Sequence, residues 1–226
     1  MDHKALAQKI DHTVLSPGAT EKDIFALCKE AKEHQFFSVC VNPARVALAS
    51  RLLRGTGVAV CSVVGFPLGA NTTAVKVAET RKALRDGARE IDVVMNVGLF
   101  RDGDYAAVLQ ELTAVRKAIG SRGILKVIVE TALLDEAQKE QATRTVAASG
   151  AEFIKTSTGT IPGGGARADD LRLFRRVADQ AGRRDLKIKA AGEIRTLETA
   201  LEMLAAGADR LGASRSIAIV NALPSP

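Results

Sequence analysis

The chain has 226 residues, of which 46% are apolar and only 4% aromatic, so small and branched aliphatic side chains must fill its core. This length suits one or two domains, and the net charge of +6 comes from basic residues that are scattered rather than clustered. Nucleic-acid binding is therefore disfavoured, and a small anionic substrate fits the charge better. No apolar run approaches the roughly 20 residues that a membrane span needs.

Eight short apolar runs predict eight strands along the chain. Most of these runs are nearly continuous, which is typical of parallel strands buried on both faces. The predicted strands are 10–13, 36–41, 58–64, 90–95, 125–130, 153–157, 187–190 and 210–213.

Amphipathic stretches between the strands predict helices. Four of them follow a residue that favours a helix N-cap, namely Thr20, Asp104, Asp135 and Thr196. Glycines end the helical stretches about every 30 residues, the size of one strand with its crossover helix. We predict an α/β fold, a single (β/α)8 TIM barrel over 1–226 with a short N-terminal helix. A doubly wound open sheet is the alternative, but no glycine-rich dinucleotide fingerprint follows the first strand.

Lys155 and Lys189 each lie inside an apolar run that a glycine soon follows. Burying a lysine in a strand is costly, because desolvation disfavours its charge. Neighbouring strands lie about 4.8 Å apart, and two ammonium groups at about 5 Å repel by roughly 3 kcal/mol at an effective dielectric of about 20. We therefore expect Lys189 to favour the uncharged form of Lys155, an amine able to attack a carbonyl carbon.

Asp92 places a carboxylate inside another apolar strand, where burial without purpose is costly. We interpret it as a proton shuttle, because carbon–carbon bond chemistry through an imine moves protons on and off the substrate. The alternative is that Asp92 or Glu130 forms a buried ion pair with one or both lysines. A carboxylate beside Lys189 would keep that lysine charged.

The loops after the seventh and eighth strands each lead into a predicted helix. Backbone amides at helix N-termini bind phosphate, and barrels often use these two loops for it. Arg195 and Arg215 lie in the two loops and could add positive charge. The glycine-rich segment 158–165 is interpreted as a mobile loop over the barrel mouth or as a flexible connection.

Metal chemistry is disfavoured by the spacing of potential ligands. Cys28, Cys40 and Cys61 have no metal-ligand spacing, and no cluster of histidine and acidic residues has one either. We expect reduced thiols in a cytoplasmic protein that needs no metal or other cofactor.

Seven motifs, in order and over nearly the whole chain, resemble the deoxyribose-phosphate aldolase family. They are Ile10-Asp11-His12-Thr13, Val39-Cys40-Val41-Asn42-Pro43, Val64-Gly65-Phe66-Pro67-Leu68-Gly69, Glu90-Ile91-Asp92-Val93-Val94, Leu125-Lys126-Val127-Ile128-Val129-Glu130-Thr131, Phe153-Ile154-Lys155-Thr156-Ser157-Thr158-Gly159 and Lys187-Ile188-Lys189-Ala190-Ala191-Gly192.

The resemblance implies a class I aldolase that cleaves 2-deoxy-D-ribose 5-phosphate reversibly to acetaldehyde and D-glyceraldehyde 3-phosphate. It assigns the Schiff base to Lys155, its charged partner to Lys189 and the proton relay to Asp92. The family forms dimers, so a homodimer is also implied. The residues that match substrate-binding positions are Asp11, Thr13, Cys40 and Thr156 around the sugar, and Gly159, Gly192, Glu193, Ile194, Gly212, Ser214 and Arg215 toward the phosphate.

The chain departs from the family pattern at the phosphate end. Glu193 replaces the second glycine of the family's Ala-Gly-Gly turn, where it would be strained at positive φ or would repel phosphate. We hypothesise that Arg215 offsets Glu193 or contacts the phosphate. Many relatives end in a tyrosine that helps to move protons, whereas the only tyrosine here is Tyr105.

Two other functions stay open on the sequence. The first is a related lysine aldolase that prefers an altered or unphosphorylated acceptor, which Glu193 would favour. The second is a phosphosugar-binding barrel without turnover. The two strand lysines with Asp92 argue against the second, because binding alone needs no activated amine.

Overall fold

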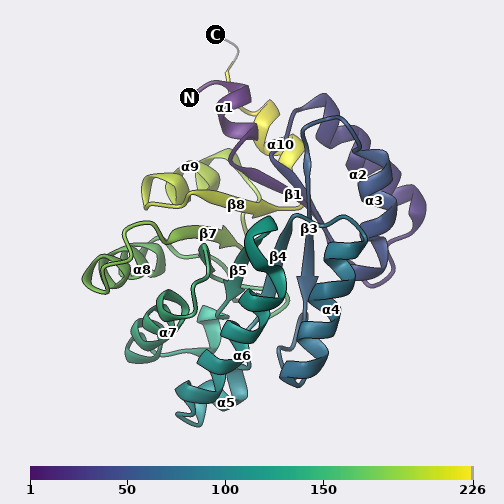
Figure 1. Ribbon diagram of the computed structural model, residues 1–226. Helices are drawn as coiled ribbons and strands as arrows, with labels where there is room; N and C mark the ends of the chain where they lie inside the picture. Colours follow the sequence, from purple (N-terminus) through teal and green to yellow (C-terminus); the bar gives the residue numbers. More distant parts are fainter. Residues whose placement is uncertain (225–226) are drawn as a thin grey trace.

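The computed structural model describes residues 1–224, apart from the side chain of Arg122. Eight parallel strands pair in chain order, and the last returns to the first to close a barrel (Figure 1). The predicted (β/α)8 barrel is confirmed. The strands are β1 Ile10–Val14, β2 Ser38–Val41, β3 Ala59–Val64, β4 Glu90–Val94, β5 Ile124–Ile128, β6 Phe153–Lys155, β7 Lys187–Ala191 and β8 Arg210–Ala213.

The sixth strand is shorter than the sequence predicted. We expected it to continue to Ser157, but it ends at Lys155. Beyond that residue, Thr156 donates its hydroxyl to the carbonyl of Ala191 and accepts the amide of the same residue. The backbone amide of Thr156 also donates to the carbonyl of Lys189 at 3.1 Å, so the segment leaves the strand while it stays tied to β7.

Helices surround the barrel, and their starts follow the predicted caps. The side chains of Thr20, Asp104, Asp135 and Thr196 each accept an amide from the first turn, as an N-cap does. The helices are α1 His3–Ala7, α2 Glu21–Glu33, α3 Val46–Leu52, α4 Thr73–Arg85, α5 Val97–Arg101, α6 Tyr105–Ile119, α7 Glu136–Ala148, α8 Ala168–Gln180, α9 Leu197–Ala205 and α10 Ser216–Asn221, with 3-10 turns at Pro43–Arg45, Gly120–Arg122 and Thr131–Leu133.

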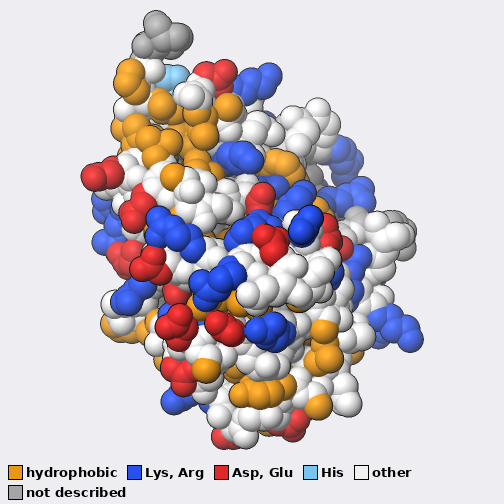
Figure 2. All heavy atoms as spheres, turned by 90° about the vertical axis from the view of Figure 1, so that its left-hand side faces the viewer, with side chains coloured by type: hydrophobic (Ala, Val, Ile, Leu, Met, Phe, Trp, Pro, Cys, Tyr) orange, Lys and Arg blue, Asp and Glu red, His pale blue; other side chains and the backbone are white. Residues whose placement is uncertain are grey.

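The predicted short N-terminal helix is present, and α1 packs against α10, the last helix of the described chain (Figure 1). On the side of α7, α8 and α9, basic and acidic side chains are interspersed (Figure 2). Some of them pair there, as Arg172 does with Asp169 and Arg176 with Glu140. Among the described residues, no helix is both long and apolar enough to cross a membrane.

The apolar core lies between the strands and the helices rather than inside the barrel. Val93, Val127 and Ile154 belong to this core and are fully buried. Successive side chains of a strand point to opposite faces. The preceding residue in β4 and β5, Asp92 and Lys126, therefore points into the barrel, where the two form an ion pair. The strands thus separate an apolar outer layer from a charged interior.

One buried ion pair lies outside the barrel and joins α4 to α6. The Nζ atom of Lys76 lies 2.7 Å from Glu111 and 2.8 Å from the carbonyl oxygen of Val94. Lys76 is fully buried and Glu111 nearly so. Burial lowers the pKa of Lys76 and raises the pKa of Glu111, although each group partly offsets the other's shift. The pair anchors the carboxyl end of β4.

We expect Lys76→Met to lower the free energy of unfolding by about 3–5 kcal/mol, because the Glu111 carboxylate would stay buried without its partner. The raised pKa of Glu111 favours its neutral form, so the loss should grow as pH rises through that pKa and shrink below it. Urea unfolding at about pH 5 and about pH 8 measures both effects.

Glu111→Gln in the Lys76→Met background is the matched control. It removes the unpaired charge while it keeps an oxygen for the amide of Asn96, which Glu111 accepts at 3.1 Å. The double variant should therefore be more stable than Lys76→Met at the higher pH. Equal or lower stability would show that the pair does not act through charge.

Candidate active site

A single carboxylate organises the interior of the barrel. One oxygen of Asp92, Oδ2, lies 2.8 Å from the Nζ atom of Lys155 and 2.8 Å from that of Lys189. Its other oxygen, Oδ1, accepts a hydrogen bond from Lys126 at 2.9 Å. Because both predicted catalytic lysines contact the same oxygen, their nitrogens are less than twice that distance apart. The predicted proximity of Lys155 and Lys189 is therefore present.

A second carboxylate, Asp11, extends the network toward β8. It accepts a hydrogen bond from Lys189 through Oδ2 and lies 2.7 Å from Arg210 through Oδ1. The hydroxyl of Ser38 donates to the same Oδ1 at 2.7 Å. Lys189 therefore lies between two carboxylates, Asp11 and Asp92, and its position is fixed from both sides.

The charge states of the network follow from these contacts. Burial raises the pKa of Asp92, but Lys126, Lys155 and Lys189 outweigh burial and hold this pKa well below its usual range. Burial lowers the pKa of Lys189, but Asp11 and Asp92 outweigh burial and raise it above its usual value. Lys189 therefore stays charged beside Lys155, as expected for a lysine with a carboxylate next to it.

Lys155 lies at the floor of a cavity of about 340 Å³ that opens at the carboxyl ends of the strands. This is the end at which enzymes with this fold place their active sites. Lys189 and Asp92 are fully buried, and only Lys155 of the three lines the cavity. A ligand in the cavity can therefore reach the Lys155 amine. Seven further predicted residues line the same cavity, namely Thr13, Gly159, Gly192, Glu193, Ile194, Gly212 and Ser214.

The loop that follows Lys155 is fixed by Glu130. Glu130 is buried and adopts the left-handed conformation, with a φ of 56°. Its Oε2 accepts the amide of Thr158 at 3.1 Å and the Thr158 hydroxyl. An ion pair between Glu130 and the lysines was one interpretation of the sequence. Its contacts instead order the loop at the cavity rim, next to Gly159.

The turn after β7 brings two loops into close contact. A Cβ atom at Gly192 would lie 3.0 Å from the Cα of Gly165 and 3.4 Å from that of Gly159. Gly192 also has a φ of 86°, so both space and conformation favour glycine there. The next residue, Glu193, keeps a positive φ of 60° although it is not glycine. The strain considered for Glu193 is therefore present in the backbone.

The partner of Glu193 differs from the one we hypothesised. Glu193 pairs with Arg195 at 3.0 Å. The Glu193 side chain is 50% exposed and the Arg195 side chain is 58% exposed. Arg215 is exposed and is not among the residues that line the cavity. Glu193 and Arg195 lie two residues apart in one short turn, so their side chains are close enough to pair.

Three predicted sugar-pocket residues lie behind the cavity wall rather than on it. Asp11 and Cys40 are buried inside the barrel, and Thr156 bonds to the backbone of Ala191. Asp11 reaches the site through its pair with Lys189, and it also lies 3.8 Å from Lys126. Their part in binding the sugar stays a prediction.

Lys126 and Arg210 were not among the predicted site residues. Lys126 lies at the centre of a strand, is fully buried and pairs with Asp92. Like Lys155 and Lys189 it lies inside an apolar run, so the same pattern could have identified it. Arg210 begins β8 and covers the ring of Phe37, with 3.3 Å between its Cζ and the ring centroid. It closes the amino end of the barrel while it pairs with Asp11.

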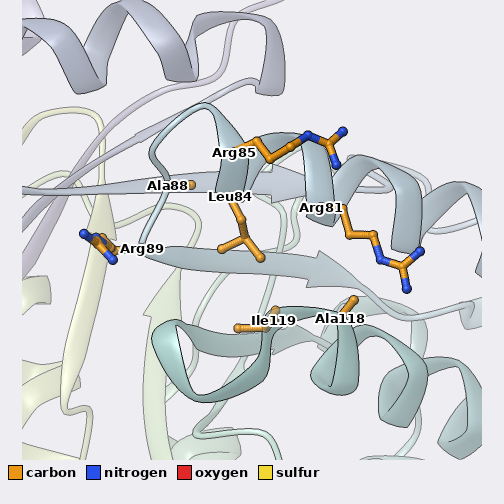
Figure 3. Close-up of a pocket in the computed structure, with 7 residues that line it drawn as sticks. All are labelled: Arg81, Leu84, Arg85, Ala88, Arg89, Ala118 and Ile119. Carbon is orange, nitrogen blue, oxygen red and sulfur yellow. The ribbon is translucent and has the colours of Figure 1, made fainter.

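A second hollow, of about 310 Å³, lies between α4 and α6 at the amino end of β4 (Figure 3). Arg81, Arg85 and Arg89 line it but point in different directions. Their guanidinium groups do not converge on one point where an anion could bind. This hollow therefore lacks the convergent polar groups of the first cavity.

Cys40, Cys61 and Asp92 are the one group among the described residues whose ligand atoms lie close enough to share a metal ion. Three lysines already surround Asp92. A cation would have to displace them against charge repulsion, so the geometry favours the ion network over a metal.

Comparison with known proteins identifies close relatives. The profile of the DeoC/LacD family aldolases matches residues 5–219. The deoxyribose-phosphate aldolase of Desulfitobacterium hafniense is 50% identical over 95% of this chain and 97% of its own. That of Dictyoglomus turgidum is 46% identical over 99% of both chains.

Solved structures agree with this relationship. A putative deoxyribose-phosphate aldolase from Coccidioides immitis superposes with a TM-score of 0.94 and 42% identity, over 98% of this chain and 86% of that one. A deoxyribose phosphate aldolase from Aeropyrum pernix, described as a unique tetramer, superposes with a TM-score of 0.89 and 33% identity, over 97% and 91%. The prediction of an aldolase is confirmed, and the chain belongs to the DeoC/LacD family of aldolases.

Proposed function

We propose that the chain cleaves 2-deoxy-D-ribose 5-phosphate reversibly to acetaldehyde and D-glyceraldehyde 3-phosphate, through a Schiff base at Lys155. The observation that carries this proposal is the position of Lys155. Its amine lies on the floor of the cavity, while its two partners, Lys189 and Asp92, are sealed beneath it. Relatives that share half of the sequence bear the name of this aldolase.

The proposed reaction begins when the neutral amine of Lys155 adds to C1 of the open-chain sugar. Loss of water then gives an iminium ion, which withdraws electrons from the C2–C3 bond. Removal of the proton from the C3 hydroxyl lets that bond break, which releases glyceraldehyde 3-phosphate and leaves an enamine. Protonation of the enamine carbon and hydrolysis of the imine release acetaldehyde and restore Lys155.

Asp92 is suited to assist these proton transfers, because its Oδ2 contacts the lysine that changes covalent state. Three cations depress its pKa, which makes it a weak base while Lys155 is charged. The Lys155 nitrogen is cationic in the iminium ion and becomes neutral as the C2–C3 bond breaks, so one of these cations is lost and the carboxylate becomes more basic during that step. We propose that Asp92 therefore gains affinity for the C3 hydroxyl proton as the enamine forms, and gives the proton up when protonation of the enamine carbon restores the iminium charge.

Borohydride reduction in the presence of acetaldehyde tests the Schiff base. We expect a stable adduct on Lys155, found by peptide mapping, because reduction converts an imine to an amine that cannot hydrolyse. Lys155→Met should abolish both the adduct and aldol cleavage. An adduct of undiminished yield in this variant would assign the imine to another lysine.

Lys189→Leu should move the pH profile of adduct formation toward higher pH. The change removes a permanent positive charge next to Lys155 and leaves Asp11 and Asp92 with one cation fewer. Both effects disfavour the neutral amine. Lys187→Leu is the matched control, because Lys187 lies on the same strand but is exposed. A profile that does not move would contradict the proposed role of Lys189.

An unphosphorylated acceptor is the second candidate, and Glu193 is the observation that favours it. Its carboxylate lies on the rim of the cavity, at the end where the resemblance places the phosphate. Because Arg195 pairs with it and both are well exposed, solvent and the arginine screen much of the repulsion. We therefore propose the phosphorylated sugar as the preferred substrate.

Glu193→Gly tests this preference. It removes the charge and relieves the positive φ, so the KM for the phosphosugar should fall roughly three- to tenfold. The KM for unphosphorylated deoxyribose should change little. Glu193→Gln removes the charge but keeps the backbone strain, and it separates the two causes. If neither variant affects the phosphosugar, Glu193 does not act on the phosphate.

A homodimer and a cytoplasmic location stay predictions for this chain. The relative from Aeropyrum pernix is described as a tetramer, which shows that this fold can assemble. Light scattering of the purified chain would determine its assembly.

A further inference from the structure

Cys40 and Cys61 lie side by side inside the barrel. They are register partners on β2 and β3, and the strand periodicity directs both side chains to the same face. Their sulfur atoms and a carboxylate oxygen of Asp92 all lie within 4.8 Å of one another. Both residues are buried, and they form a small cluster with Val63 apart from the main core.

The distances suit a covalent bond between the two sulfurs. Partners on neighbouring parallel strands lie about 4.8 Å apart, which is within the Cα separation of about 4.4–6.8 Å that disulfides span. We propose that Cys40 and Cys61 form a reversible intramolecular disulfide in the wall of the active site when a hydroperoxide reaches it. The inference rests on strand register and thiol contact, so it stands whether or not the proposed substrate is correct.

Cys40 is the thiol that reacts first. The neighbouring Cys61 thiol lowers the pKa of Cys40, and Lys189 and Lys155 lower it further against the effect of burial. Burial and the neighbouring acids raise the pKa of Cys61 well above its usual value. Thiolates are the reactive form, so the two thiols have distinct roles.

The reaction balances with the hydroperoxide as the only oxidant. The Cys40 sulfur attacks one peroxide oxygen, the O–O bond breaks, and the thiol proton leaves with the alcohol, or with water when the oxidant is hydrogen peroxide. This gives a sulfenic acid at Cys40. The Cys61 sulfur then attacks the Cys40 sulfur, the S–O bond breaks, and the hydroxyl group leaves with the Cys61 proton as water.

A small oxidant has only one layer of side chains to pass. Leu15 and Phe66 pack against the Cys40 and Cys61 cluster, and both also line the cavity above Lys155. The sulfurs are therefore directly behind the cavity wall. The third cysteine, Cys28, lies on α2 and belongs to the main core, away from this pair.

The disulfide would act on the catalytic carboxylate. Cys61 now donates its S–H to Oδ1 of Asp92 at 3.1 Å, and Lys126 lies 3.5 Å from the same sulfur. Oxidation removes that donor and draws the Cys61 sulfur toward β2. Asp92 then loses one of the hydrogen bonds that orient it, so the oxidised chain should have lower aldolase activity.

The test uses full-length Cys28→Ala, in which the two barrel thiols are the only ones. After treatment with hydrogen peroxide, thiol titration of the denatured chain should fall from two thiols to none. Peptide mapping should then show one peptide that joins residues 40 and 61 within a monomer. Aldolase activity should fall with the thiols, and dithiothreitol should restore both.

Cys61→Ala in the same background is the matched control. Its single thiol should oxidise to a sulfenic acid and form no intramolecular disulfide. The thiol and mass measurements do not depend on activity, so a loss of folding in this control leaves the first experiment decisive. The proposal would be overturned if the thiols do not react with peroxide or if they form disulfides between chains. It would also be overturned if they are oxidised without a peptide that joins residues 40 and 61. A disulfide that leaves activity unchanged would overturn the effect on Asp92.

Discussion

One oxygen atom of Asp92, shared by two lysines, is the constraint on which the site depends. Two buried ammonium groups at this separation would repel by roughly 3 kcal/mol at an effective dielectric of about 20. Each would also lose its hydration, which costs more than the repulsion. The carboxylate between Lys155 and Lys189 offsets both terms, and it fixes the two nitrogens on one oxygen. Without it, the strands could not keep both lysines inside the barrel.

The ion network around Asp92 also determines which part of the structure supplies the folding stability. Asp11, Glu90 and Asp92 face Lys126, Lys155, Lys189 and Arg210, so three carboxylates balance three cations when the Lys155 amine is neutral. Buried ion pairs contribute little net stability, because desolvation consumes most of their attraction. The apolar layer between strands and helices must therefore supply the stability, which frees the interior for chemistry.

The sequence predicted what local patterns determine. Apolar runs located all eight strands, and the caps Thr20 and Asp104 located helix starts, because both signals lie within a few residues. The lysines in apolar strands revealed the site for the same reason. The partners of those lysines were harder to predict. Asp11 and Lys189, for example, lie 178 positions apart and meet only because the barrel closes. The pairing of Glu193 with Arg195 depends on a turn geometry that the residue types alone do not determine.

The two ends of the cavity therefore differ in how strongly charge acts on a ligand. At the floor, the charged groups are buried and weakly screened, so they act strongly on the part of a ligand that reaches Lys155. At the rim, Glu193 and Arg195 are exposed and neutralise each other, so they act weakly. A phosphate at the rim would depend on backbone amides of the loops after β7 and β8 rather than on a buried cation. Substitution at Glu193 should thus tune affinity, whereas substitution at the floor should affect the chemical step itself.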